Sequence, residues 1–327
     1  MPRQVIVHAA SRLHFGLFAL AARSPAAAER SYGGVGVMVD RPGLELHVAA
    51  TTQPGLEIVA DSLAERINTF AGRWSEFYSR PLQGLRISLL NPTPDHIGLG
   101  TGTQLGLAVA AGLATFHGWP VPPVEELARS VGRGARSAVG AYGFALGGLI
   151  VDRGKLPGEF LAPLDCRLAL PAAWRFVLVR PQSGAGLAGE REQQAMDHAN
   201  RNLGPLTEQL VAEARERLLP AAAQQNFADF AASLGRYCEL AGQFYTDVQG
   251  GPYNGPVVAA LAQRIRDLGH RGMGQSSWGP TLFVVCEHEV AAQELAAKLA
   301  AGATAHDRPE ITIAAVFNEP ARIEVND

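Results

Sequence analysis

The sequence has few lysines, few cysteines and no local metal-binding pattern. Its only lysines are Lys155 and Lys298, and neither follows the glycines at residues 98–102, which excludes a Walker loop ending in Gly-Lys-Ser/Thr. Its 3 cysteines are an odd number at wide spacing, which fits neither a disulfide framework nor a Cys-x-x-Cys metal site and indicates a reducing compartment. Its 9 histidines never occur as His-x-His or His-x-x-x-His, so we expect no transition-metal site built from a local motif.

Long apolar runs and an excess of one charge are also missing. The absence of any run of 18 apolar residues excludes a membrane-spanning helix, and Arg3, His8, Arg12 and His14 interrupt the one segment that could pass for a signal peptide. With 28 basic and 31 acidic residues, the net charge of -3 gives no basis for binding nucleic acid or an anionic membrane. We therefore expect a cytoplasmic protein that acts on small molecules, with no nucleic acid and no membrane as a partner.

The sequence contains enough apolar residues for about two domains, with 47% hydrophobic residues in 327. In the first part, hydrophobic periodicity predicts an antiparallel meander of strands at 4–10, 12–20, 34–40 and 44–50, with a tight turn at Arg41-Pro42-Gly43, then a helix at 61–78, a strand at 85–89 and a helix at 103–116. After a boundary near 165–175, the pattern predicts a strand at 175–181, several helices between 190 and 268, and a β-α-β unit over 280–318. The fold class is therefore α+β, with domains at 1–170 and 171–327.

The most informative segment is the glycine-rich loop that leads into the helix expected at 103–116. Gly98, Gly100 and Gly102 allow the backbone N–H groups to approach a ligand, and the helix that follows presents its positive end. This pattern is typical of an anion-binding loop, although glycines also occur where a loop only packs tightly. The dinucleotide fingerprint is disfavoured, because Pro120 stands where an acidic residue is expected, about 20 residues further on, and Glu125 belongs to a separate predicted helix.

Three motifs in order resemble those of the GHMP small-molecule kinase superfamily. They are Pro94–Thr101 (PDHIGLGT), Ala9–Gly16 (AASRLHFG) and Gly272–Thr281 (GMGQSSWGPT). The resemblance implies a GHMP-kinase-like two-domain fold, with a ribosomal-S5-like N-terminal half, a ferredoxin-like C-terminal half and the active site between them.

Two groups that the kinases of this superfamily use are absent. Where the kinases have paired serines after Gly-Leu-Gly, this chain has Thr101-Gly102, so the hydroxyl directed at the metal is missing. Gly140 stands where the resemblance places the catalytic aspartate. Their joint loss favours a different reaction in the same pocket, while an ATP-dependent kinase and a non-catalytic ligand-binding relative remain as alternatives.

Four segments are similar to the β-ribofuranosylaminobenzene 5′-phosphate synthase family of methanopterin biosynthesis. They are SRLH at 11–14, GLGTGTQ at 98–104, RSAVG at 136–140 followed by GGLIV at 147–151, and GMGQSSWGPT at 272–281. The resemblance implies a glycosyltransferase that condenses phosphoribosyl pyrophosphate with 4-aminobenzoate or 4-hydroxybenzoate and releases CO2 and pyrophosphate. The sequence does not decide between the two benzoates, and Ala145-Leu146 depart from the more polar residues of many relatives.

The resemblance and the chemistry of the side chains together define the candidate site. Guanidinium groups match phosphate or carboxylate, and the indole offers a face to an aryl ring. The expected substrate-binding residues are Ser11, Arg12, His14, Gly98, Leu99, Gly100, Thr101, Gly102, Thr103, Arg136, Ser137, Ser183, Gln275, Ser276, Ser277 and Trp278. Of these, Arg12 or His14 is expected to contact a substrate anion. Mg2+ is the expected cofactor, with Glu190 and Glu192 as candidate ligands, although glutamate is also common in a first helical turn. The superfamily favours a homodimer. No catalytic acid or base is assigned.

Overall fold

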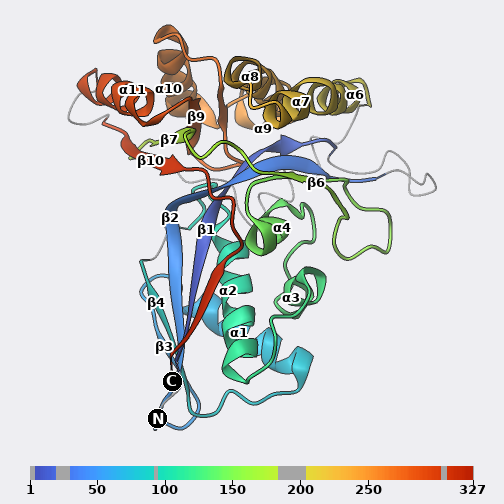
Figure 1. Ribbon diagram of the computed structural model, residues 1–327, viewed down its shortest axis with the longest axis vertical. Helices are drawn as coiled ribbons and strands as arrows, with labels where there is room; N and C mark the ends of the chain where they lie inside the picture. Colours follow the sequence, from blue (N-terminus) through green and yellow to red (C-terminus); the bar gives the residue numbers. More distant parts are fainter. Residues whose placement is uncertain (1–3, 20–29, 92–94, 183–203, 303–307, 327) are drawn as a thin grey trace.

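The computed structural model describes residues 4–19, 30–91, 95–182, 204–302 and 308–326. Figure 1 shows a large sheet with helices on one side, and above it a smaller sheet covered by a layer of helices. Among the described residues no helix is both long enough and apolar enough to cross a membrane. The 3 cysteines, Cys166, Cys238 and Cys286, are free thiols.

The larger sheet has 7 strands, in the order β11-β1-β2-β4-β3, with β5 pairing with β2 and β6 pairing with β5. Its strands are β1 (Gln4–Leu17), β2 (Gly34–Ala50), β3 (Leu56–Val59), β4 (Leu85–Leu90), β5 (Leu149–Asp152), β6 (Leu164–Leu168) and β11 (Arg322–Asn326). The helices of this half are α1 (Ala64–Tyr78), α2 (Thr101–Phe116), α3 (Val124–Ser130) and α4 (Val139–Leu146). Helix α2 is buried along nearly its whole length, because it consists of small and apolar residues that pack against β1 and β2.

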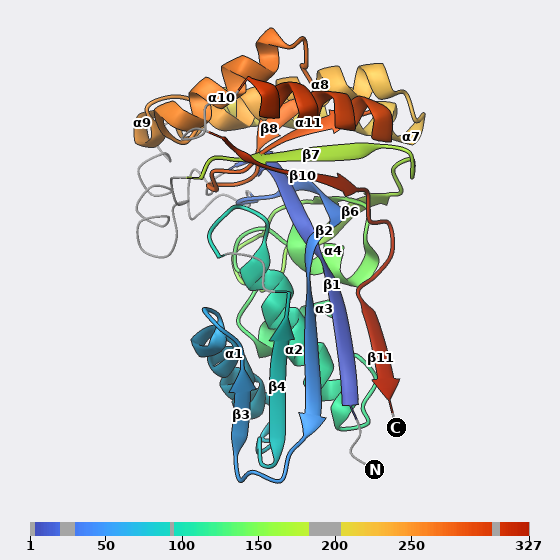
Figure 2. The same ribbon diagram turned by 90° about the vertical axis from the view of Figure 1, so that its left-hand side faces the viewer.

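The smaller sheet has 4 strands in the order β10-β7-β9-β8. Its strands are β7 (Arg175–Arg180), β8 (Met273–Gln275), β9 (Leu282–Cys286) and β10 (Glu310–Ala315). The helices are α6 (Gly204–Glu213), the π-helical turn η1 (Ala214–Leu218), α7 (Leu219–Ala223), α8 (Phe227–Gln243), α9 (Thr246–Gln249), α10 (Gly255–Asp267) and α11 (Glu289–Ala301). Figure 2 shows these helices together above the sheet, at the end of the molecule opposite both termini. The α+β two-domain fold expected from the sequence is confirmed.

The expected turn at Arg41-Pro42-Gly43 was wrong. Both flanking segments pair with β1, because Val39 faces Ser11 and Leu44 faces Ala9, and the residues between them form an irregularity within one long strand. A proline, which lacks an N–H group, is tolerated in a strand at such a bulge. The first four expected strands are therefore two long strands, and these carry Arg12 and His14 into the middle of the molecule.

The two halves share a core and a strand. Phe15 of β1 packs against Phe176 of β7 and Phe283 of β9, with ring centroids 6.4 and 5.2 Å apart. The last strand, β11, pairs antiparallel with β1, so residues 322–326 lie in the sheet of the first half although they follow the second half in sequence. The domain boundary expected at residue 170 stays a prediction. Strand β11 lies in the sheet of the first half although it follows that boundary in sequence.

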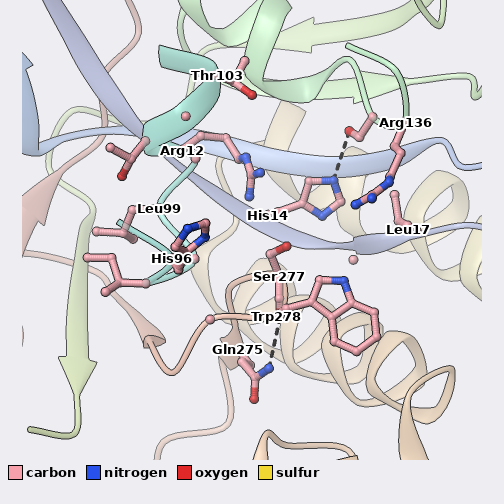
Figure 3. A pocket seen from close by; sticks show the side chains of 18 of the residues that line it. Arg12, His14, Leu17, His96, Leu99, Thr103, Arg136, Gln275, Ser277 and Trp278 are labelled. Carbon is pink, nitrogen blue, oxygen red and sulfur yellow. Dashed lines mark hydrogen bonds between the residues drawn. The ribbon is translucent and has the colours of Figure 1, made fainter. Parts of the chain in front are cut away.

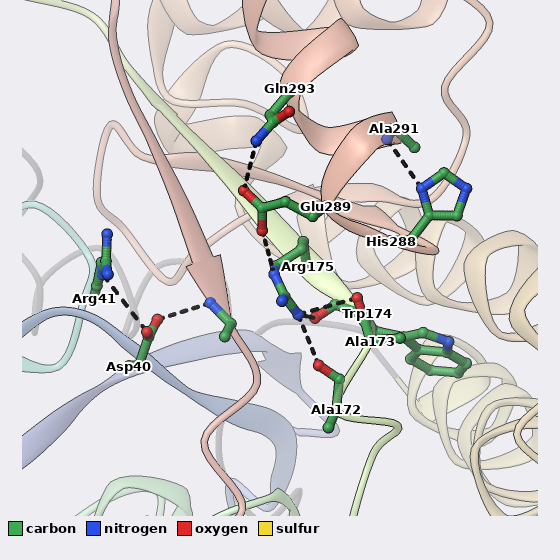
Figure 4. A network of polar contacts seen from close by, with 11 residues as sticks. Asp40, Arg41, Ala172, Ala173, Trp174, Arg175, His288, Glu289, Ala291 and Gln293 are labelled. Atoms are coloured by element: carbon green, nitrogen blue, oxygen red, sulfur yellow. Dashed lines mark hydrogen bonds and ion pairs between the residues drawn. The ribbon is translucent and has the colours of Figure 1, made fainter.

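A polar network provides a further link between the two sheets (Figure 4). The Asp40 carboxylate at the β2 irregularity accepts a hydrogen bond from the Ala315 N–H at the end of β10, at 2.7 Å. Nearby, Arg175 of β7 donates to Glu289 at the start of α11, at 2.6 Å. The hydrogen bond between Ala315 and Asp40 and the shared core hold the two halves together, while the contact between Arg175 and Glu289 joins β7 to α11 within the second half.

Candidate active site

A cavity of about 610 Å³ lies between the two halves and contains most of the expected site residues. Its wall consists of residues from β1, α1, the loop before α2 and the first turn of α2, the loop before α4, helix α8 with the segment after it, and the end of β8 with the loop after it. Figure 3 shows Arg12, His14 and Arg136 on one side, with Ser277, Trp278 and Gln275 opposite them. The volume lies in the range of roughly 300–1,000 Å³ that is usual for small-molecule sites.

The loop before α2 has the backbone conformation of an anion cradle. Gly98 and Gly100 have φ values of +90° and +72°, which side chains disfavour, and Gly100 is the N-cap of α2 with no side-chain cap. The Arg12 N–H donates to the Leu99 carbonyl at 2.9 Å and so fixes this loop to β1. The uncapped first turn of α2 therefore opens onto the cavity with the positive end of its dipole.

Four arginines line the cavity: Arg12, Arg66, Arg133 and Arg136. Arg12 lies against Gly100, where an added Cβ would be 3.1 Å from its Nε. Arg66 and Arg133 lie against Gly102 in the first turn of α2, and the Arg133 guanidinium donates to the Thr103 hydroxyl at 3.2 Å. Since the chain as a whole has a net charge of -3, this concentration of cations marks a site for a ligand with several negative charges.

The sequence missed Arg66 and Arg133. Arg66 is on α1, and nothing in its sequence position indicates that α1 passes beside the glycine loop. Arg133 stands between Gly132 and Gly134, a context like that of Arg136, and could have been included. The Arg66 guanidinium fills the space that a side chain at position 102 would occupy.

The expected substrate-binding residues fall into three groups. Those that line the cavity are Arg12, His14, Gly98, Leu99, Gly100, Thr101, Gly102, Thr103, Arg136, Ser137, Gln275, Ser277 and Trp278. Ser11 and Ser276 are buried and do not line it. Ser183 lies outside the described residues, as do Glu190 and Glu192.

Ser11 and Ser276 hold the walls of the cavity in place. The Ser11 hydroxyl accepts a hydrogen bond from the Gly43 N–H at the β2 irregularity, at 3.3 Å. The Ser276 hydroxyl accepts from the His14 N–H at 3.0 Å and donates to the Gly98 carbonyl at 2.6 Å. Ser276 thus connects the loop after β8 to both β1 and the loop before α2.

The opposite wall is aromatic. Trp278 packs against Tyr245 with ring centroids 4.1 Å apart, and both residues line the cavity together with Tyr253. Gln275 is engaged in the structure of its own loop, where its amide donates to the Ser277 carbonyl at 3.0 Å and accepts from the Asn254 N–H at 2.7 Å. The wall therefore offers aromatic faces with few charged groups, as an aryl ring requires.

A hydrogen-bond chain leads from the cavity into the core. His14 Nε2 lies 3.0 Å from the Ser137 hydroxyl, a contact drawn as a dashed line in Figure 3. The Ser137 hydroxyl donates to the carboxylate of Asp152 at 2.9 Å, and Asp152 is fully buried at the end of β5. The sequence missed Asp152, although an acidic residue directly after the apolar run Leu149–Val151 was a visible signal.

The prediction of Mg2+ stays untested, because its candidate ligands Glu190 and Glu192 lie outside the described residues. The described residues contain no group of three or more histidine, cysteine, aspartate or glutamate side chains placed to hold a metal ion. The carboxylate that lines the cavity, Asp95, is paired with Arg66, and His96 Nε2 lies 3.3 Å from it. Oxygen ligands for a hard cation are therefore scarce in this part of the chain.

Removal of divalent ions should leave the unfolding temperature unchanged. A resident ion stabilises the folded state by mass action, and within the part of the chain that the structure describes there is no cluster to hold one. We expect thermal unfolding in excess chelator and in millimolar Mg2+ to agree within about 1 °C. An increase of several degrees with Mg2+ would instead reveal a resident site, with Glu190 and Glu192 the first residues to replace.

Two positions that differ from relatives lie away from the cavity. Ala145 and Leu146 do not line it, and Leu146 is exposed at the end of α4. Gly140, at the position of the kinase aspartate, is buried with its Cα facing α2, where an added Cβ would be 3.2 Å from Thr103 Cγ2. A carboxylate at position 140 would therefore be crowded against α2.

Known proteins resemble the chain in both sequence and fold. A family model described as "GHMP kinases C terminal" matches residues 218–304. The beta-ribofuranosylphenol 5'-phosphate synthase of Methanothermobacter thermautotrophicus is 26% identical over 308 residues, which are 88% of this chain and 90% of the relative. A protein of the same name from Archaeoglobus fulgidus is 28% identical over 272 residues, 78% of this chain and 80% of the relative.

Among solved structures, homoserine kinase from Cytophaga hutchinsonii superimposes with a TM-score of 0.67 at 17% identity, over 98% of this chain and 97% of the kinase. The chain therefore has the fold of a GHMP kinase, and residues 218–304 match the C-terminal family model of these kinases. Over most of its length, its sequence is similar to those of the beta-ribofuranosylphenol 5'-phosphate synthases.

Proposed function

We propose that the protein is a pentosyltransferase that joins the ribose of phosphoribosyl pyrophosphate to 4-hydroxybenzoate or 4-aminobenzoate, with release of CO2 and pyrophosphate. One observation carries the proposal: a single cavity combines an anion-binding loop and four arginines with an aromatic wall. The donor has a diphosphate and a 5′-phosphate, and the acceptor is an aryl carboxylate, so the two substrates need these two kinds of surface. The names of the curated relatives support the hydroxybenzoate in particular.

The arginines and the glycine loop would act on the leaving group. As the bond from ribose C1 to the pyrophosphate oxygen breaks, negative charge develops on pyrophosphate and positive charge on the ribose ring. Donors already fixed in position stabilise such charge without further reorganisation. Arg66 and Arg133 are placed for this role, because both lie against the first turn of α2.

The ring carbon that carries the carboxylate would form the new bond to ribose C1. The para hydroxyl or amino group supplies electron density to that carbon, and the bond to the carboxylate then breaks, leaving its electron pair in the ring to restore aromaticity. No proton leaves a ring carbon in this sequence. The chain must therefore orient the two substrates and exclude water.

We further propose that the protein uses Mg2+, forms a homodimer and is located in the cytoplasm. The described residues contain no group of three or more candidate ligand side chains placed to hold a metal ion, and we propose Mg2+ as an ion carried by the diphosphate oxygens of the donor. No step of the reaction is assigned to it. The dimer follows from likeness to the superfamily, and the cytoplasm from the scarcity and spacing of cysteine.

The proposed function is tested by identifying the product. We expect incubation with Mg2+, phosphoribosyl pyrophosphate and either benzoate to yield an aryl C-riboside 5′-phosphate that lacks the carboxyl group, detected by mass spectrometry. ATP with sugar and polyol acceptors serves as the comparison, because kinases are among the solved structures of similar fold. Formation of ADP without any riboside would replace this proposal with a kinase activity.

A further inference from the structure

The hydrogen bonds around Ser137 determine which nitrogen of His14 carries a proton. A hydroxyl group has one proton and two lone pairs. The Ser137 hydroxyl donates its proton to Asp152 Oδ2 at 2.9 Å and accepts from the Val139 N–H at 3.2 Å. The lone pair that remains can only accept, so the His14 Nε2 atom, 3.0 Å away, must carry its proton. Nδ1 is then left as an unprotonated acceptor.

The charges around this chain favour the same arrangement. Burial raises the pKa of Asp152 to about 6, against hydrogen bonds from Gly154, Ser137 and Ala138 that lower it, so this carboxylate is ionised at pH 7.5. Burial and then the nearby Arg12 lower the pKa of His14 well below its usual value, so its imidazole is neutral at that pH. Arg136, on the loop that carries Ser137, also lines this side of the cavity.

We propose that Asp152 and Ser137 are positioning residues that hold His14 as the Nε2–H tautomer, so that His14 Nδ1 accepts a hydrogen bond from a substrate hydroxyl. His14 lines the cavity, and in the described part of the chain Nδ1 has no hydrogen-bond partner. Gly34 leaves room for the ring, since a Cβ there would be 3.0 Å from His14 Cε1. This inference rests on the proposed function for the identity of the substrate.

An acceptor at Nδ1 cannot bind the anionic groups of the substrates. Phosphate and carboxylate oxygens are also acceptors, so of the two residues expected to contact an anion, this tautomer leaves that role to Arg12. Of the substrate hydroxyls that could donate to Nδ1, two would also promote the reaction: the para hydroxyl of 4-hydroxybenzoate and the 2′-hydroxyl of the ribose, which is next to the reacting C1. In the first case the contact increases electron density on the attacking ring, and in the second it stabilises the positive charge that develops on the ribose.

The tautomer can be measured without turnover. Two-dimensional NMR of protein labelled with 15N at histidine distinguishes the two nitrogens, and the spectrum of His14→Phe identifies the His14 signals among those of the 9 histidines. At pH 7.5 we expect a neutral ring protonated at Nε2, and a mixture of tautomers in Ser137→Ala. A ring protonated at Nδ1, or at both nitrogens, would overturn the proposal. Because this measurement needs no substrate, it remains valid if the proposed reaction is wrong.

Two affinity ratios test the contact itself. The first compares 4-hydroxybenzoate with 4-methoxybenzoate, and the second compares ribose 5-phosphate with 2-deoxyribose 5-phosphate, each by calorimetry. We expect one ratio to be at least about tenfold in the wild type, to fall to about one in His14→Phe, and to be intermediate in Ser137→Ala. The ratio that changes identifies the hydroxyl.

A matched control separates this effect from the loss of any buried serine. Ser233 also donates to a buried carboxylate, that of Glu213, at 2.6 Å, and neither residue lines the cavity. Ser233→Ala should leave both ratios unchanged. If His14→Phe changes neither ratio, or if Ser233→Ala changes them as much as Ser137→Ala does, the positioning role is refuted.

Discussion

Gly98→Ala should lower kcat/KM by at least about 100-fold while the protein remains folded. At this glycine the loop before α2 touches the loop after β8: an added Cβ would be 2.3 Å from the Ser276 carbonyl oxygen and 3.1 Å from Gly279 Cα. These are backbone atoms, so the methyl group can be accommodated only if the two loops separate. A displacement of about 1 Å at a reacting centre costs on the order of 100-fold in rate.

Gly158 provides the matched control. It has the same φ of +90°, so alanine meets the same backbone strain there, but no atom lies within 4 Å of the added Cβ. We expect Gly158→Ala to reduce kcat/KM by less than about twofold, since surface positions away from a site contribute little. Circular dichroism and thermal unfolding should confirm that both variants fold. A folded Gly98→Ala protein with activity close to that of Gly158→Ala would show that contact between the two loops is not needed for the site.

The second large effect is expected at Arg136. Loss of a guanidinium that binds an anion in a desolvated site should reduce kcat/KM by roughly 30- to 1,000-fold, or about 2–4 kcal/mol. Arg136→Lys should recover little, because an ammonium group cannot reproduce the planar pair of donors. Steady-state kinetics with phosphoribosyl pyrophosphate and with the benzoate varied in turn would identify the anion that Arg136 binds.

Arg86 is the control for charge removal, because it forms an exposed ion pair with Glu57 on β3 and does not line the cavity. Exposed ion pairs contribute little, so Arg86→Ala should remain within about twofold of the wild type. If Arg136→Ala changes both kinetic constants by less than about threefold, Arg136 does not bind a substrate, and the loop before α4 has a structural role only.

The sequence predicted those parts of the site that are contiguous in the chain. The glycines at 98–102 allow backbone conformations that other residues disfavour, so an anion loop before a helix could be inferred without knowing the fold. Arg66 and Asp152 reach the site only through tertiary packing, one from α1 and the other from the end of β5. No short pattern records that kind of proximity.

In the fold, too, the elements marked by a local sequence pattern were predicted, and those that depend on tertiary packing were missed. Helix α4 was missed, because it lies in a glycine-rich stretch of low helix propensity. The packing of Ala141 and Phe144 against the core stabilises this helix. Strand β11 was missed because it is short and partly exposed, and its partner β1 is at the other end of the chain. By contrast, α2 and β9 were predicted, since long apolar segments of this kind are buried wherever they occur.

The most direct test of the proposed reaction is to follow the carboxyl carbon. With 4-hydroxybenzoate labelled in its carboxyl group, the release of labelled CO2 should require phosphoribosyl pyrophosphate and should equal the pyrophosphate formed, one for one. That result would show that ribosyl transfer and decarboxylation are coupled in one reaction. Pyrophosphate released without labelled CO2, or labelled CO2 released without phosphoribosyl pyrophosphate, would contradict the account.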